Sequence, residues 1–272
     1  MQMTERQLVY LYCVTEEEPK LREVECLADN LHSVHHKELY GVAGDVEDSE
    51  FGEENLKRNL VDLEWVRAKA TTHERVIEGI MEDTCVIPFK FGTLFNTNDG
   101  LKAMLEVYGE EFKTILGELK NKQEWGVKIY CDIQRLKSGI ADRQPEILEV
   151  ENEIKSSSVG KAYFLKKKKA ELIEQAVNKK INQYGRESFA LLKDLSSAAR
   201  INRLLPKEVT EREDDMILNS AFLVDNDSVH DFVSLANSLK TRYEDAGFSV
   251  DCTGPWPPYN FCSLPKSRGQ NG

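Results

Sequence analysis

The chain has 272 residues, of which 40% are hydrophobic, and this content is enough for one large or two ordinary packed domains. Its 36 basic and 47 acidic residues give a formal net charge of −11, which argues against nucleic acid or an anionic membrane surface as the main partner. No apolar run approaches the roughly 20 residues of a membrane span, and the N-terminus lacks the pattern of a secretory leader, so we expect a folded cytoplasmic protein.

Charge is spread unevenly along the chain. The first sixty residues contain 14 acidic and 6 basic side chains, whereas Lys161 to Lys180 contain seven lysines and two glutamates. We therefore expect an acidic and a basic pole. Such poles attract each other within one molecule or between neighbouring molecules.

The six cysteines form no metal or redox motif. They are Cys13, Cys26, Cys85, Cys131, Cys252 and Cys262. No two of them stand in a C-x-x-C pair, and three lie inside apolar runs, so we expect buried, reduced thiols.

The first part of the chain mixes strand and helix patterns. The run "QLVYLYCV" (7–14) is apolar on both faces, as in a central strand, and residues 31–46 predict one or two further strands. From Glu53 to Ile80, apolar residues recur in steps of three or four. This spacing predicts a helix of about seven turns with a break near Thr71.

The segment "CVIPFKFGTLF" predicts another strand. Ile87, Phe89 and Phe91 are expected on one face of this strand, and Pro88 indicates a sheet edge or a bulge. A second amphipathic helix follows at 101–119 and completes an N-terminal α+β domain, residues 1–123.

A second unit begins at "EWGVKIYCD". Trp125, Val127, Ile129 and Cys131 alternate with polar residues and predict a strand with one buried face. The elements expected after it are short helices in 134–158, a long helix from 159 to 195, strands near 198–205 and 216–224, a helix from 228 to 247 and the closing strand "FSVDC". This β-α-β-β-α-β order is that of a ferredoxin-like fold with a helical insertion, and we place the domain at 124–252.

Capping residues indicate where two of the helices begin. Asn98 or Asp99 is the expected N-cap of the helix over 101–119. Ser228 with Asp231 has the spacing of a capping box, and Gly247 is the expected end of that helix.

The histidines invite two chemical hypotheses. His32, His35 and His36 have a spacing that allows metal binding on a helix, but the surrounding residues predict a strand, and metal binding is the weaker interpretation. His73 lies on an apolar helix stripe, which favours a core histidine over a catalytic base because no nucleophile for it is identifiable.

Other catalytic and binding motifs are missing from the sequence. No G-x-S-x-G, G-x-x-x-x-G-K-[ST] or H-E-x-x-H occurs, and "GVAGDVE" lacks the third glycine of a dinucleotide-binding loop. The run Lys166 to Lys169 spreads around a helix, which favours a solvated helix over a nucleic-acid site. We therefore expect no cofactor, no metal and no catalytic residue.

The last distinctive segment is "GPWPPYNF", at 254–261. Its three prolines exclude a helix interior and a central strand, so we expect an extended tail over 253–272. Its aromatic side chains favour burial, and we weigh an intramolecular clasp above an arm that binds a partner.

Three motifs occur in order along the chain: "HERVIEGIMEDTCVIPFKFGTLF", "EWGVKIY" and "TGPWPPYNF". Together they resemble the gas vesicle protein GvpF/GvpL family, and the resemblance covers nearly the whole chain. This sequence departs from the family pattern only at Phe261 and in its polar end, "KSRGQNG". The residues that carry the resemblance, as candidates for structural or interaction roles, are Pro88, Phe89, Phe91, Gly92, Trp125, Gly126, Gly254, Pro255, Trp256, Pro257, Pro258, Tyr259 and Phe261.

The resemblance implies a non-enzymatic accessory or minor structural protein of the gas vesicle. It also implies a cytoplasmic location, contact with the major shell protein GvpA and other vesicle proteins, and a C-terminal domain of modified ferredoxin fold. Two other hypotheses stay open, a ligand-binding regulatory module of ferredoxin-like type and, less favoured, a cysteine or histidine hydrolase.

Overall fold

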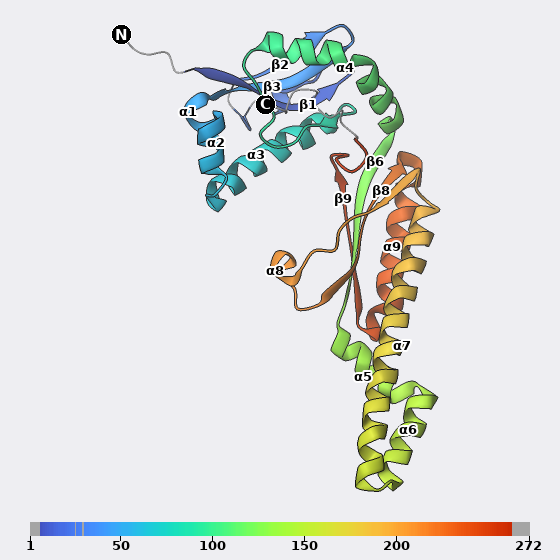
Figure 1. The fold of residues 1–272 in the computed structure, drawn as a ribbon. Helices are drawn as coiled ribbons and strands as arrows, with labels where there is room; N and C mark the ends of the chain where they lie inside the picture. The colour runs from blue at the N-terminus through green and yellow to red at the C-terminus, as the bar shows by residue number, and fades with distance from the viewer. Residues whose placement is uncertain (1–5, 25, 29, 263–272) are drawn as a thin grey trace. The chain divides into compact units, whose positions relative to one another are not determined.

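The computed structural model describes residues 6–24, 26–28 and 30–262. The chain forms two compact units. Unit 1 comprises Met1–Gln123 and Trp256–Gly272, and unit 2 comprises Glu124–Pro255. Both units combine helices with one antiparallel sheet, so the fold is of the mixed α+β class that the sequence predicts (Figure 1).

Unit 1 is built around a sheet whose central strand is apolar on both faces. Its strands are β1 (Gln7–Thr15), β2 (Leu31–His36), β3 (Leu39–Glu47), β4 (Ile87–Pro88) and β5 (Leu94–Phe95), in the order β2-β3-β1-β4, with β5 also paired to β1. Strand β1 runs antiparallel to β3, from Gln7 opposite Glu47 to Thr15 opposite Tyr40. Strand β4, which contains Pro88, lies at the end of this order, the edge position that a proline tolerates.

Helices cover both faces of this sheet (Figure 1). The helical segments of unit 1 are η1 (Leu21–Glu23), α1 (Asp48–Phe51), α2 (Glu53–Asn59), α3 (Leu63–Met81) and α4 (Asn98–Leu119). Leu8, Tyr10 and Tyr12 of β1 share a buried cluster with residues of α1 and α3. On the other face, α4 approaches so closely that a Cβ at Gly41 would lie 3.2 Å from the Leu101 side chain.

Two predictions about helix boundaries in unit 1 are wrong. The expected seven-turn helix breaks between Asn59 and Leu63, and not near Thr71, because Asp62 caps a new helix there. The N-cap of α4 is Thr97, whose side chain accepts a hydrogen bond from the Gly100 N–H, and not Asn98 or Asp99.

The strand alternation predicts Phe89 and Phe91 on one face, but the two side chains lie on opposite faces of the sheet. Strand β4 ends at Pro88, so the alternation of a strand does not continue beyond it. Phe89 contacts Phe112 of α4, with ring centroids 6.0 Å apart, whereas Phe91 packs into the cluster on the opposite face of the sheet.

Unit 2 has a four-stranded sheet in the order β7-β8-β6-β9. Its elements are β6 (Lys122–Cys131), α5 (Ile133–Arg143), α6 (Pro145–Ser156), α7 (Val159–Lys193), β7 (Ala198–Ile201), α8 (Lys207–Thr210), β8 (Asp215–Asp225), η2 (Asn226–Ser228), α9 (Val229–Tyr243), η3 (Glu244–Ala246) and β9 (Phe248–Trp256). The core contains Val127, Ile129 and Cys131 of β6 together with residues of α7 and α9, so these two helices cover the same face of the sheet. Trp125 packs against this cluster, as the alternation in β6 predicts.

The N-terminal half of α7 does not contribute buried residues to the core of the sheet. It pairs with α6 in a helical hairpin, in which Ile147 and Val150 of α6 are buried (Figure 1). Only the C-terminal half of α7 contributes fully buried side chains to the sheet core, among them Val177, Tyr184 and Leu192.

Three further local predictions differ from the structure. Ser228 precedes α9 but its side chain makes no capping hydrogen bond. Strand β7 ends at Ile201, short of the expected 205. The tail is extended only as far as Trp256, where β9 ends, and then turns, because the Phe261 N–H donates to the Pro258 carbonyl at 3.0 Å. Residues 263–272 of the predicted tail lie outside the described residues.

Candidate functional site

A buried histidine joins three segments of unit 1. His73 lies on the inner face of α3, where 1% of its surface is exposed. Its Nδ1 is 2.9 Å from the hydroxyl of Tyr10 on β1, and its Nε2 is 3.1 Å from the carbonyl oxygen of Phe89. The Tyr10 hydroxyl also accepts a hydrogen bond from the Gly92 N–H at 3.0 Å. Both ring nitrogens of the core histidine are therefore hydrogen-bonded.

These partners define where the protons lie. A backbone carbonyl only accepts, so the proton of a neutral His73 sits on Nε2 and points to Phe89. Nδ1 then accepts from the Tyr10 hydroxyl, which in turn accepts from Gly92. Gly92 has φ of +79°, in the left-handed region that favours glycine, and this conformation aims its N–H at Tyr10.

The C-terminal aromatic motif reaches the same network. The Tyr259 hydroxyl lies 3.1 Å from His73 Nε2 and donates to Oε1 of Glu74 at 3.0 Å. Tyr259 packs against the cluster of β1 and α3, and the neighbouring residues Pro257 and Pro258 are buried. Tyr259 is therefore the anchor of the motif, whereas Trp256, which we expected to be buried, is 44% exposed.

Burial controls the protonation of this network. Desolvation lowers the pKa of His73 from 6.5 to about 4, although the hydrogen bond to Phe89 acts in the opposite direction. Desolvation also raises the pKa values of Tyr10 and Tyr259 above their usual range and raises the pKa of Glu74. At neutral pH the imidazole is thus uncharged and both phenols keep their protons.

Four of the six cysteines are poor nucleophiles, whereas Cys26 is exposed, contrary to the expectation of buried thiols. Burial raises the pKa of Cys85 and Cys252 to about 11 and that of Cys131 to about 12, and it raises the pKa of Cys13 further. Because the thiolate is the reactive form, these thiols are inert at neutral pH. The arrangement disfavours the hydrolase hypothesis.

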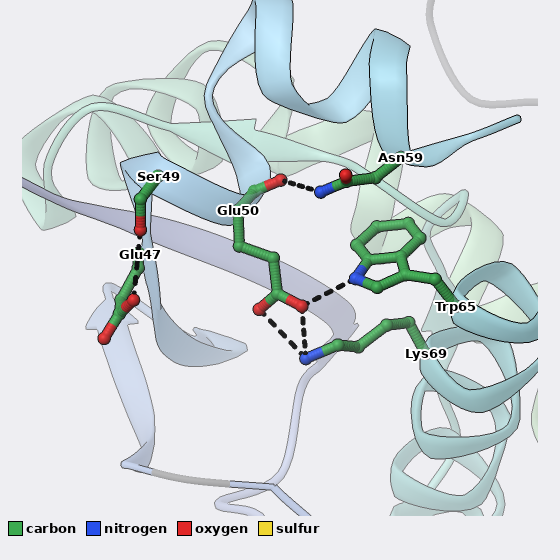
Figure 2. A network of polar contacts seen from close by, with 6 residues as sticks. All are labelled: Glu47, Ser49, Glu50, Asn59, Trp65 and Lys69. Carbon is green, nitrogen blue, oxygen red and sulfur yellow. Dashed lines mark hydrogen bonds and ion pairs between the residues drawn. The ribbon is translucent and has the colours of Figure 1, made fainter. Parts of the chain in front are cut away.

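A second polar network holds α1 and α2 against α3 (Figure 2). The Glu50 carboxylate accepts from Trp65 Nε1 at 2.6 Å and from Lys69 Nζ at 2.9 Å, and the Glu50 carbonyl accepts from Asn59 Nδ2 at 3.0 Å. Lys69 also lies 5.5 Å from the centre of the Phe51 ring, which packs on Trp65. Glu50 therefore connects three helices, and all of these contacts are intramolecular.

The remaining motif residues contribute to unit 2 and to the end of the chain. Gly254 has φ of +150°, and a Cβ there would lie 2.9 Å from the Glu124 carbonyl and 3.0 Å from the Trp125 ring, so a side chain would clash. Gly126 lies in β6, and Pro255 follows Gly254 across a cis peptide bond in β9. Phe261 is half-buried.

The histidines near position 32 do not converge. His32, on β2, contacts the Asn30 carbonyl and the Asn98 side chain, each at 3.0 Å, whereas His35 stacks on Tyr40. Among the residues that the structure describes, no three His, Cys, Asp or Glu side chains are grouped so as to hold a metal ion. Within the same residues, no helix is both long and apolar enough to cross a membrane.

Fold and site together define a two-unit α+β protein in which the aromatic motifs make intramolecular contacts with other segments of the chain. Comparison with known proteins gives the family. The family described as "Gas vesicle synthesis protein GvpL/GvpF" matches residues 8–263, and the chain belongs to it. This result confirms the resemblance that the three motifs indicate.

Relatives of the chain cover most of its length. It is 28% identical over 229 residues to gas vesicle protein L of Streptomyces sp. (strain CB03234), which covers 84% of this chain and 82% of that protein. It is 26% identical over 260 residues to gas vesicle protein L1 of Halobacterium salinarum, covering 93% and 89%.

A solved structure shows the same fold. The crystal structure of the gas vesicle protein GvpF from Anabaena sp. PCC7120 superposes with a TM-score of 0.70, covering 96% of this chain and 100% of that one. At 16% identity this likeness concerns the fold alone.

Proposed function

We propose that this chain is a non-catalytic accessory or minor structural protein of gas vesicle assembly, which works in the cytoplasm and binds the major shell protein GvpA and other vesicle proteins. Membership of the GvpL/GvpF family supplies the setting. The observation that carries the non-catalytic part is the network around His73, where both imidazole nitrogens and the Tyr259 hydroxyl are bonded inside unit 1. Such a site offers no free base for turnover.

The finer architecture belongs to the same proposal. We propose that residues 124–252 form a modified ferredoxin-like domain with α5 and α6 as the helical insertion, and that residues 1–123 form an N-terminal domain. The order of elements and the strand order β7-β8-β6-β9 support this assignment. We also propose that the tail from 253 onward acts as an intramolecular clasp, a role supported by the contacts of Tyr259 with His73 and Glu74.

Co-expression with GvpA tests the function directly. We expect the shell protein to stay in the soluble fraction and to co-purify with this chain, and with its His73→Gln variant at temperatures where that variant is folded. Insoluble GvpA beside a folded, soluble chain would contradict the proposal. A thermal-shift screen with nucleotides and divalent metals tests the alternative hypothesis of a regulatory ligand-binding module, because such a module would be stabilised by its ligand.

A further inference from the structure

The hairpin of α6 and α7 exposes an apolar cluster at the start of α7. Val159, Tyr163 and Phe164 are 91%, 69% and 71% exposed, and the two aromatic rings meet edge to face with centroids 5.8 Å apart. Single apolar side chains are common on protein surfaces, but a contiguous exposed cluster marks an interaction site. These three residues lie within two turns of one helix, so one partner surface can cover them together.

Lysines surround this cluster. Lys161 and Lys166 to Lys168 are all exposed, and none of them takes part in an ion pair within the part of the chain that the structure describes. Lys169, by contrast, pairs with Glu151 at 2.8 Å. We name Val159, Lys161, Tyr163, Phe164, Lys167 and Lys168 the tip surface. Its partner must offer carboxylates beside apolar groups, which excludes a symmetric pairing of two tip surfaces because their lysines would repel.

Helix α4 presents a face with the complementary chemistry. Ala103, Val107, Thr114 and Gly117 recur at steps of four, seven and three along its solvent side, with four exposed glutamates among them: Glu106, Glu110, Glu111 and Glu118. Val107 is 72% exposed, and a Cβ at Gly117 would meet nothing within 4 Å. We name these eight residues the α4 face.

The carboxylates of the α4 face are only partly neutralised. Glu106 and Glu110 have distant lysine partners, at 3.9 Å and 3.7 Å, and Glu111 and Glu118 take part in no ion pair among the described residues. The small side chains between them leave room for the rings of Tyr163 and Phe164. Charge, polarity and size are thus matched between the two surfaces.

We propose that the tip surface of one copy docks on the α4 face of a second copy, so that the chain associates with itself head to tail. The contact joins two different surfaces and is therefore heterologous, and each copy that uses one surface can still use the other, so contacts of this kind form closed rings or open chains of copies. The net charge of −11 repels copies in general, and the basic tip surface is where an acidic neighbour can approach. The proposal concerns the purified chain alone, so its failure and the failure of GvpA binding are distinguishable.

Sedimentation of the purified full-length chain tests this proposal. We expect the average mass to rise with protein concentration at low ionic strength and to fall as salt is added. The variants K167E/K168E and E110K/E111K should each weaken association at least about tenfold, because each places like charges in the contact. K179E/K180E is the matched control, since it makes the same charge change further along α7 without neighbouring exposed aromatic residues and should associate like the parent chain.

Mixing the two variants gives the sharpest outcome. K167E/K168E keeps a native α4 face and E110K/E111K keeps a native tip surface, so an equal mixture should associate although neither variant does alone. Circular dichroism and thermal melting verify that both are folded. A parent chain that stays monomeric at every concentration, a mixture that stays monomeric, or a control that weakens as much as K167E/K168E would overturn the proposal.

Discussion

The hydroxyl of Tyr259 is the group through which the C-terminal motif enters the buried network. It lies 3.1 Å from His73 Nε2 and 3.0 Å from Glu74. We expect Tyr259→Phe to reduce the free energy of unfolding by about 1–2 kcal/mol, because a part-buried carboxylate loses its donor. Urea unfolding of the full chain measures this loss. Tyr163→Phe is the control, since the exposed Tyr163 hydroxyl bonds to nothing in the described residues, and an equal loss in both variants would contradict the account.

His73 makes the stability of unit 1 depend on pH. Its folded pKa of about 4 lies below the ordinary 6.5, so the unfolded chain takes up the proton first as pH falls. Above pH 6.5 the imidazole is neutral in both states and causes no loss of stability. Between pH 6.5 and pH 4 the free energy of unfolding falls by on the order of 3 kcal/mol. The raised pKa of Glu74 acts in the opposite direction, since protonation of that carboxyl favours the folded state.

The comparison of His73→Gln with the parent chain isolates this effect. Unfolding free energies measured from pH 7 to pH 4 should converge, because the variant lacks the titrating group and loses less stability over that range. Parallel curves would show that His73 does not titrate as the structure indicates.

At the scale of the elements, a single capping residue decides where a helix begins. The Asp62 side chain accepts from the N–H groups of Glu64 and Trp65, at 3.0 Å and 3.2 Å, and so begins α3. We expect Asp62→Ala to reduce stability by about 1 kcal/mol. Ser228→Ala provides the comparison, because the Ser228 side chain makes no capping bond before α9. Equal effects in the two variants, measured by thermal unfolding, would contradict this assignment.

The same helix start shows where sequence reasoning failed. Leu60 and Leu63 are in phase with the apolar stripe, so the periodicity predicts one continuous helix. Both are largely exposed, at 48% and 81%, and Asp62 interrupts the helix between them. The periodicity of apolar residues does not indicate which of them are buried. Strand β6 was predictable because its alternation coincides with burial.

Whole-molecule contacts were the least predictable. The sequence identified His73 as a core histidine and "GPWPPYNF" as a segment that seeks burial, but nothing local connects two residues 186 positions apart. Glu50, Trp65 and Tyr10 were missed for the same reason, since each has its partner in another element. The order of the three motifs indicated the family but none of these contacts.

The tail should stabilise unit 1 as a whole. A chain that ends at Trp256 lacks the buried Pro257 and Pro258 and the anchor Tyr259, and we expect it to melt at a lower temperature than a chain that ends at Cys262. The difference between the two truncations isolates residues 257–262. Equal melting temperatures together with lost binding to shell subunits would identify the segment as an arm for a partner.

Vesicle formation by cells that carry His73→Gln in place of the native chain tests most directly whether the buried network is structural or catalytic. The substitution removes the best candidate base, and at a growth temperature well below its unfolding midpoint the variant protein stays folded. We predict that vesicles form in proportion to the amount of folded variant. A variant that is folded and present at normal abundance at the growth temperature but yields no vesicles would contradict the structural role.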